Sequence, residues 1–135
     1  MKDNMDEYIR MITLAAETGR VAYQAELGER YLWGNGVPKD VDRGLYWLYM
    51  AAENGDVETW LELGDIYRYG EIAGYRNYRE ALKWYGKAAS KKNADAMEAI
   101  GRLYEKGRGV EKDIEYAEEW YRKAYEARKR NQEKK

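Results

Sequence analysis

The chain of 135 residues has the usual length of one domain, and its 44% hydrophobic share is sufficient for a buried core. It contains no cysteine and no histidine, which excludes disulfides, thiolate nucleophiles and zinc-finger sites and removes the commonest near-neutral general base. The net charge of −1 gives no overall signal for polyanion binding, although residues 1–67 are mainly acidic and residues 68–135 mainly basic.

No apolar run approaches the roughly 20 residues that a membrane-spanning helix needs. The N-terminus, Met1-Lys2-Asp3-Asn4-Met5-Asp6-Glu7, is acidic and lacks the apolar segment of a signal peptide. We therefore expect a soluble protein of the cytoplasm that does not act at a membrane.

A unit of about 36 residues recurs along the chain, which is typical of helical repeat proteins. A glycine recurs at spacings of 36 and 37 residues, with a tyrosine three residues later and a second glycine six residues later. A tryptophan recurs at 37 and 36 residues, with an alanine four residues later. These positions are Gly28, Gly64 and Gly101 for the glycine and Trp47, Trp84 and Trp120 for the tryptophan. The 17-residue offset from tryptophan to the next glycine, run backwards from Gly28, reaches Met11.

The offsets predict the organisation of a single domain in chain order. It consists of an N-terminal half-repeat helix at 5–18, repeat 1 at 20–55, repeat 2 at 56–92, repeat 3 at 93–126 and a basic C-terminal tail at 127–135. Each repeat is expected to form two antiparallel helices. The first ends at the glycine after its tyrosine, where glycine adopts the left-handed conformation without strain. Asp40 and Asp113 are the expected N-caps of the second helix in repeats 1 and 3.

These residues resemble the Sel1-like repeat, a relative of the tetratricopeptide repeat. Residues 101–124 follow its pattern most closely. Repeat 1 departs from the pattern with Gly44 in place of alanine and Leu48 in place of tyrosine, repeat 2 lacks the G-x-G-V turn, and repeat 3 has Tyr125 in the second alanine position. The resemblance implies an all-α fold: a right-handed α-solenoid of antiparallel helix hairpins with an N-terminal capping helix. It also implies a protein that binds other proteins as an adaptor, regulator or inhibitor.

The first helices of the repeats are expected to line a concave groove, which is the candidate site for a partner protein. Its predicted residues are Glu26, Glu29, Arg30, Trp33, Trp60, Glu62, Asp65, Arg68, Tyr69 and Arg102. Trp33 and Trp60 do not recur between repeats, so the packing of the repeat does not demand them, and exposed tryptophans are common interface anchors. An acidic surface with aromatic rings suits a basic, partly apolar segment. The alternative is an ordinary solvated helix face.

The sequence predicts no enzyme, and no catalytic, cofactor or metal site. The Gly-x-Gly turns at Gly34 and Gly107 follow helices and recur with the repeat, whereas a phosphate loop follows a strand. Ser90 is the only serine and has no recognisable base nearby in the sequence. We therefore expect no small-molecule substrate. Glu62 and Asp65 could bind a hard cation weakly, but such pairs are abundant on solvated helices.

Two further functions are weighed against partner binding in the groove. The acidic first half of one copy could bind the basic second half of another, an association that salt would weaken in an otherwise monomeric protein. Nucleic-acid binding through the basic C-terminal half is placed last, because phosphate binding usually needs a wider basic patch.

Overall fold

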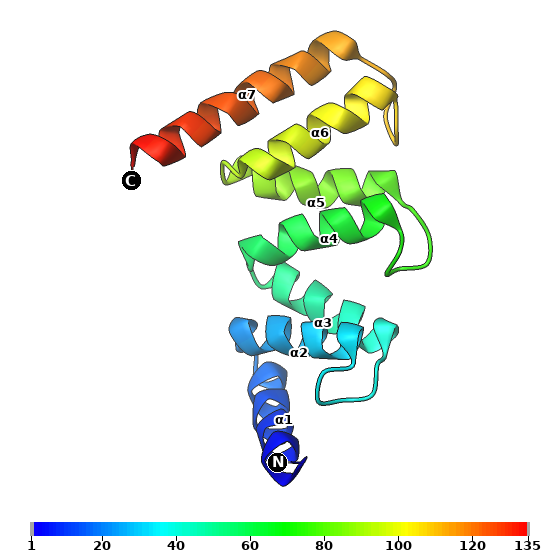
Figure 1. Cartoon of the computed structure of the whole chain (residues 1–135), viewed down its shortest axis with the longest axis vertical. Coiled ribbons are helices and arrows are strands. Elements are labelled where there is room, and N and C mark those ends of the chain that lie inside the picture. Colours follow the sequence, from blue (N-terminus) through cyan, green and yellow to red (C-terminus); the bar gives the residue numbers. More distant parts are fainter. Residues whose placement is uncertain (1, 135) are drawn as a thin grey trace. The chain divides into compact units, whose positions relative to one another are not determined.

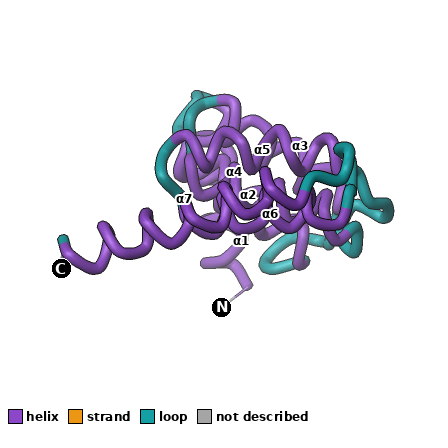
Figure 2. The backbone as a smooth tube through the Cα atoms, turned by 90° about the horizontal axis from the view of Figure 1, so that it is seen from above, coloured by secondary structure: helices purple, strands orange, loops and turns teal. Residues whose placement is uncertain are grey.

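The computed structural model describes residues 2–134, and the side chains from residue 4 onward. Within this range the chain forms seven α-helices joined by loops, and no strand (Figures 1 and 2). The helices are α1 (Lys2–Glu17), α2 (Val21–Trp33), α3 (Val41–Glu53), α4 (Val57–Tyr69), α5 (Tyr78–Ser90), α6 (Ala94–Lys106) and α7 (Ile114–Glu133). They group into two compact units, Met1–Thr59 and Trp60–Lys135, each of which is described by itself.

The helix ends confirm the predicted caps. Gly34 and Gly107 both have φ of 69° and end α2 and α6 in the left-handed conformation. The side chain of Asp40 accepts a hydrogen bond from the backbone N–H of Arg43, and Asp113 accepts the equivalent bond in repeat 3. These bonds satisfy backbone donors that have no partner within the helix. Asn77 caps α5 in the same way, which the sequence analysis did not anticipate.

In the first unit, α2 and α3 run antiparallel, and α1 packs on α2 (Figure 1). Ile12 and Ala16 of α1 and Leu27 of α2 form a buried apolar cluster. The polar side chain of Gln24 is fully buried; its Nε2 donates to the carbonyl of Ala16 at 3.1 Å and its Oε1 accepts from Nδ2 of Asn54 at 3.0 Å. Because these bonds use both ends of the amide, Gln24 joins the end of α1 to the end of α3 without leaving an unsatisfied polar group.

In the second unit, the core contains apolar residues next to or within the recurring motifs. Leu63, Trp84 and Ile100 are at most 2% exposed. The indole Nε1 of Trp84 donates to Glu80 at 3.1 Å. Trp120, the recurring tryptophan of repeat 3, is half-buried, and its Nε1 is buried without an acceptor. The reason lies in the sequence, since Tyr116 occupies the position four residues before Trp120 where repeat 2 has Glu80.

Helix α7 extends to Glu133, so the basic stretch after residue 126 is helical over most of its length. Seven charged side chains of this helix are exposed: Glu118, Glu119, Arg122, Lys123, Glu126, Lys129 and Arg130. Ala117 and Ala124 are buried on the opposite face. Helix α7 therefore presents a charged surface to solvent and an alanine-lined surface to the core.

The recurring glycine allows the two helices of each repeat to approach closely. A Cβ atom added at Gly64 would lie 2.5 Å from two ring carbons of Tyr85, and one added at Gly101 would lie 2.6 Å from Tyr121. In repeat 1 the corresponding neighbour of Gly28 is Leu48, at 2.9 Å. Real Cβ atoms do not approach so near without displacing the neighbour, so a side chain at these positions would force the helices apart.

The residues in which repeat 1 departs from the family pattern compensate for one another in size. Leu32 occupies the position that holds Arg68 in repeat 2 and a glutamate in repeat 3. It packs against Gly44, where an added Cβ would lie 2.6 Å from Cδ2 of Leu32. Leu48 replaces the tyrosine of the other repeats and is fully buried. Repeat 1 thus fills with leucine the space that its neighbours fill with a tyrosine and its polar partner.

Candidate functional site

In the first unit, two of the predicted groove residues bind each other and are contacted by α1. Glu26 accepts hydrogen bonds from the hydroxyl of Tyr8 at 2.8 and 2.9 Å and forms a 3.0 Å ion pair with Arg30. The guanidinium of Arg30 lies 5.2 Å from the centre of the Tyr8 ring. The hydrogen bond to Glu26 raises the pKa of Tyr8. Glu26 and Arg30 are therefore engaged within the unit, which leaves them less available to a partner.

Glu29 and Trp33 form a second, more exposed pair on α2. The indole Nε1 of Trp33 donates to Glu29 at 3.1 Å, and 63% of Trp33 is exposed. In repeat 2 the residue after the recurring glycine, Asp65, accepts a hydrogen bond from Tyr85, but repeat 1 has Leu48 at the tyrosine position and offers Glu29 no hydroxyl. Glu29 consequently bonds the tryptophan one turn along its own helix and fixes the exposed indole on the surface.

In the second unit, three predicted groove residues line a pocket of about 220 Å³ at the C-terminal end of α4. They are Glu62, Asp65 and Tyr69, joined by Ile66 of the same helix and by Glu71 and Ile72 of the following turn. The lining consists of three carboxylates, one tyrosine ring and two isoleucines, with no basic side chain. We call this site the acidic pocket.

The carboxylate of Asp65 has a structural partner. It accepts a hydrogen bond from the hydroxyl of Tyr85, which lies on α5. Burial and, to a smaller extent, this hydrogen bond raise the pKa of Tyr85 well above that of an exposed tyrosine. The phenol thus stays protonated as a donor, and Asp65 stays held at the edge of the acidic pocket by a fixed bond.

The remaining predicted residues lie outside the acidic pocket. The guanidinium of Arg68 lies 5.0 Å from the centre of the Tyr69 ring, which is 53% exposed. Trp60 is half-buried, with Nζ of Lys87 5.6 Å from its ring centre. Arg102 is exposed on α6 and forms a 3.9 Å ion pair with Glu98 one turn away. A groove that continues across both units remains a prediction of the sequence analysis.

Glu71, Ile72 and Tyr8 were not among the site residues predicted from the sequence. Glu71 and Ile72 belong to the turn that is one residue longer than in the other repeats, and that extra residue is the signal that could have identified them. Tyr8 contacts Glu26 across 18 residues of sequence, a contact that helix periodicity does not reveal.

The fold and the recurring contacts define a helical repeat protein built from antiparallel hairpins, and the comparison with known families agrees. The Sel1 repeat model matches residues 21–56, 61–93 and 94–128. The chain belongs to the Sel1 repeat family, which confirms the predicted all-α α-solenoid class and its three repeats. Sel1 repeats form a scaffold for protein–protein interaction.

Two curated relatives are components of ubiquitin ligases. The chain is 31% identical over 117 residues to the ERAD-associated E3 ubiquitin-protein ligase component HRD3B of Arabidopsis thaliana, covering 83% of this chain and 18% of that protein. It is 48% identical over 46 residues to the corresponding HRD3 component of Candida glabrata, covering 34% of this chain and 6% of that protein. The chain therefore spans less than a fifth of the length of either relative.

Solved structures give the same fold. A Sel1 repeat protein from Oxalobacter formigenes matches with a TM-score of 0.72 and 37% identity, over 98% of this chain and 99% of that one. A protective antigen of uropathogenic Escherichia coli with an SLR fold matches with a TM-score of 0.78 and 36% identity, over 87% of this chain and 25% of that one. The cysteine-rich protein B of Helicobacter pylori, at 21% identity and a TM-score of 0.62 over 94% of this chain and 90% of that one, shares the fold.

None of the helices described is long and apolar enough to cross a membrane. Among residues 2–134, no group of three or more histidine, cysteine, aspartate or glutamate side chains is arranged to hold a metal ion.

Proposed function

We propose that this protein is a non-catalytic protein-binding module, and that the acidic pocket receives a lysine or arginine side chain from a basic, partly apolar segment of its partner. The observation that supports this is the lining itself. Glu62, Asp65 and Glu71 supply negative charge, while Ile66 and Ile72 supply apolar surface for the aliphatic stem of such a side chain. Long basic side chains combine these two properties.

Trp33 is proposed as a second contact for the partner. It is a large, exposed ring whose orientation is fixed by Glu29, so little side-chain entropy remains to be lost on binding. Tryptophans of this kind are frequent hot spots at interfaces. Glu26 and Arg30, which the groove hypothesis also included, contribute less because they are already bound to each other and to Tyr8. The location in the cytoplasm stays a prediction from the sequence.

The test measures the affinity of the full chain for a labelled synthetic peptide in which lysine alternates with leucine, and for its counterpart in which serine replaces lysine. We expect binding of the lysine peptide alone. Glu71→Lys should weaken it by about tenfold, because a like charge at an interface opposes association. Glu71 is chosen because it forms no ion pair among the described residues, so its loss leaves the fold intact.

The matched control is Glu58→Lys, which makes the same change at an exposed carboxylate of α4 that does not line the acidic pocket. It should change the affinity by less than about twofold, since screened surface charges interact weakly. Equal weakening by both substitutions, or equal binding of the two peptides, would contradict the proposal. A second arm compares the proteins retained from source cells by the parent chain and by Glu71→Lys.

A further inference from the structure

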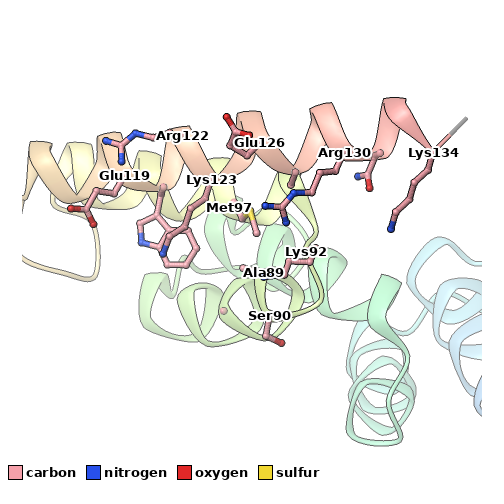
Figure 3. Close-up of a pocket in the computed structure, with 14 residues that line it drawn as sticks. Ala89, Ser90, Lys92, Met97, Glu119, Arg122, Lys123, Glu126, Arg130 and Lys134 are labelled. Atoms are coloured by element: carbon pink, nitrogen blue, oxygen red, sulfur yellow. The ribbon is translucent and has the colours of Figure 1, made fainter.

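A larger cleft lies on a different surface of the second unit. It has a volume of about 640 Å³ and is bounded by α5, the start of α6 and the part of α7 from Glu119 onward (Figure 3). We call it the basic cleft, because its lining has five basic side chains and two carboxylates. The basic residues are Lys92, Arg122, Lys123, Arg130 and Lys134, and the carboxylates are Glu119 and Glu126. In Figure 3, Arg130 and Lys134 extend toward the cleft, while the carboxylate of Glu126 points away from it.

The positive charge of the basic cleft is not neutralised within its own unit. None of its five basic side chains forms a salt bridge with another residue of the described chain. Nζ of Lys123 instead lies 4.5 Å from the centre of the Trp120 ring. A cluster of unpaired like charges raises the energy of the unbound protein and favours an acidic ligand.

Apolar side chains form the base of the cleft between these charges. Met97, Ala89 and Ala127 line the cleft, and each is at most 7% exposed. Gly86 lies beside them and is unusual among the 13 glycines, because its φ is not positive and an added Cβ would meet no atom within 4 Å. A glycine inside a helix costs about 1 kcal/mol relative to alanine. Neither backbone conformation nor packing within the chain requires it, but it allows a partner to approach the α5 backbone.

The outer face of α1 has the complementary chemistry. Met11 and Leu14 are 62% and 66% exposed, although Met11 stands at the position of the recurring tryptophan. Glu7 is exposed and precedes them at helical spacing, so residues 7, 11 and 14 share one face. The opposite face packs on α2 through Ile12 and Ala16. Arg10 and Glu17 are also exposed on this face, which therefore has two carboxylates, one arginine and two large apolar side chains.

We infer that the basic cleft of one copy binds the outer face of α1 from a second copy. Met11 and Leu14 cover the apolar lining beside Gly86, and Glu7 lies among the basic side chains of α7. The surfaces differ, so the contact is heterologous and joins copies head to tail. This inference is independent of the proposed function, which uses the acidic pocket.

A protein occupant fits the basic cleft better than a nucleic acid. The apolar lining would remain in contact with water beneath a phosphate backbone, and Glu119 would repel it. Sites for single-stranded nucleic acids combine basic residues with several stacking rings, whereas Trp120 is the one aromatic residue in this lining.

The test is sedimentation equilibrium of the full chain over a range of concentrations, at low ionic strength and at about 1 M salt, where the Debye length is about 3 Å. We expect concentration-dependent oligomers at low salt and weaker association at high salt. Replacing Met11 and Leu14 together by serine, or making Lys123→Glu with Arg130→Glu, should each raise the dissociation constant by about tenfold or more. Circular dichroism confirms that each variant is folded.

Matched controls keep the charge changes but move them off the two surfaces. Lys129→Glu lies on α7 outside the basic cleft, and Glu58→Lys lies at an exposed position of α4 rather than on α1. Each should alter the dissociation constant by less than about threefold, as expected of screened surface charges.

Mixing two charge-reversed variants provides the most direct test of the proposed contact. Glu7→Lys and the Lys123→Glu, Arg130→Glu variant should each associate weakly alone, and a mixture of the two should recover association, because each then presents a complementary surface to the other. A monomeric parent chain at every concentration and both salt levels overturns the inference. So does a mixture that fails to recover association, or a loss caused equally by Lys129→Glu. Binding of single-stranded DNA or polyglutamate to a monomeric parent chain would assign the basic cleft to another occupant and overturn it as well.

Discussion

The ring of Tyr85 occupies the space that a side chain at Gly64 would need: a Cβ there would lie 2.5 Å from Cδ1 and Cε1 of the ring. Gly64→Ala should therefore destabilise the protein by about 1–3 kcal/mol, because the fully buried ring has no room to move away. The free energy of unfolding from denaturant titration measures this cost.

Gly86→Ala is the matched control, since it adds the same methyl group inside a helix where nothing lies within 4 Å. It should stabilise the protein by roughly 0.5–1 kcal/mol through helix propensity. Effects of the same sign at the two positions would show that close helix approach does not explain the recurring glycine.

Gly44→Ala should cost about 1 kcal/mol or more in repeat 1, even though repeats 2 and 3 have alanine at this position. The cause is Leu32, whose Cδ2 would lie 2.6 Å from the new Cβ. A double-mutant cycle with Leu32→Ala separates this clash from other effects. In the Leu32→Ala background the second substitution should cost less or become favourable, and strict additivity would rule out the clash.

Trp84→Phe should destabilise the protein by about 1–2 kcal/mol more than Trp120→Phe. Trp84 is fully buried and loses the hydrogen bond from its Nε1 to Glu80, whereas Trp120 is half-buried and its Nε1 has no acceptor to lose. Chemical denaturation of the two variants provides the comparison. A larger loss at Trp120 would mean that its indole nitrogen has a role in the folded state.

The raised pKa of Tyr121 leads us to expect a loss of stability at alkaline pH. Burial and, to a smaller extent, the hydrogen bond to Glu105 raise the pKa of Tyr121 to about 12. An unfolded chain loses the same proton near pH 10, so its contribution to stability is complete below about pH 10 and is lost as the pH rises to about 12. The free energy of unfolding measured across this interval should fall less steeply for Tyr121→Phe than for the parent chain. Parallel curves would contradict the raised pKa.

The recurring glycines, tyrosines and tryptophans were sufficient to predict the seven helices and two of their N-caps, because repeat spacing and cap chemistry are local signals. Leu27, Leu63 and Ile100 are core residues for the same reason. In repeat 1, Gly44 and Leu48 could be recognised in the sequence as departures from the family pattern, but the reason for them could not. Only the packing of Leu32 on Gly44 shows that the two residues compensate for each other.

The candidate site was predicted in part. Glu62, Asp65 and Tyr69 do line one pocket, but a sequence cannot show which residues of the turn after α4 fold back onto that helix, and so Glu71 and Ile72 were missed. The contact of Tyr8 with Glu26 depends on how α1 packs on α2. The helical spacing of the sequence places Tyr8 and Glu26 on helices, but it does not indicate that their side chains contact each other.

The bond between Tyr8 and Glu26 makes the N-terminal helix a cover over part of the acidic surface of α2. Any event that detached α1, whether proteolysis near Gly19 or local unfolding, would uncover the Glu26–Arg30 pair together with the apolar cluster beneath Ile12. Removal of the sixteen residues of α1 would therefore change both the net charge and the exposed apolar surface of the first unit.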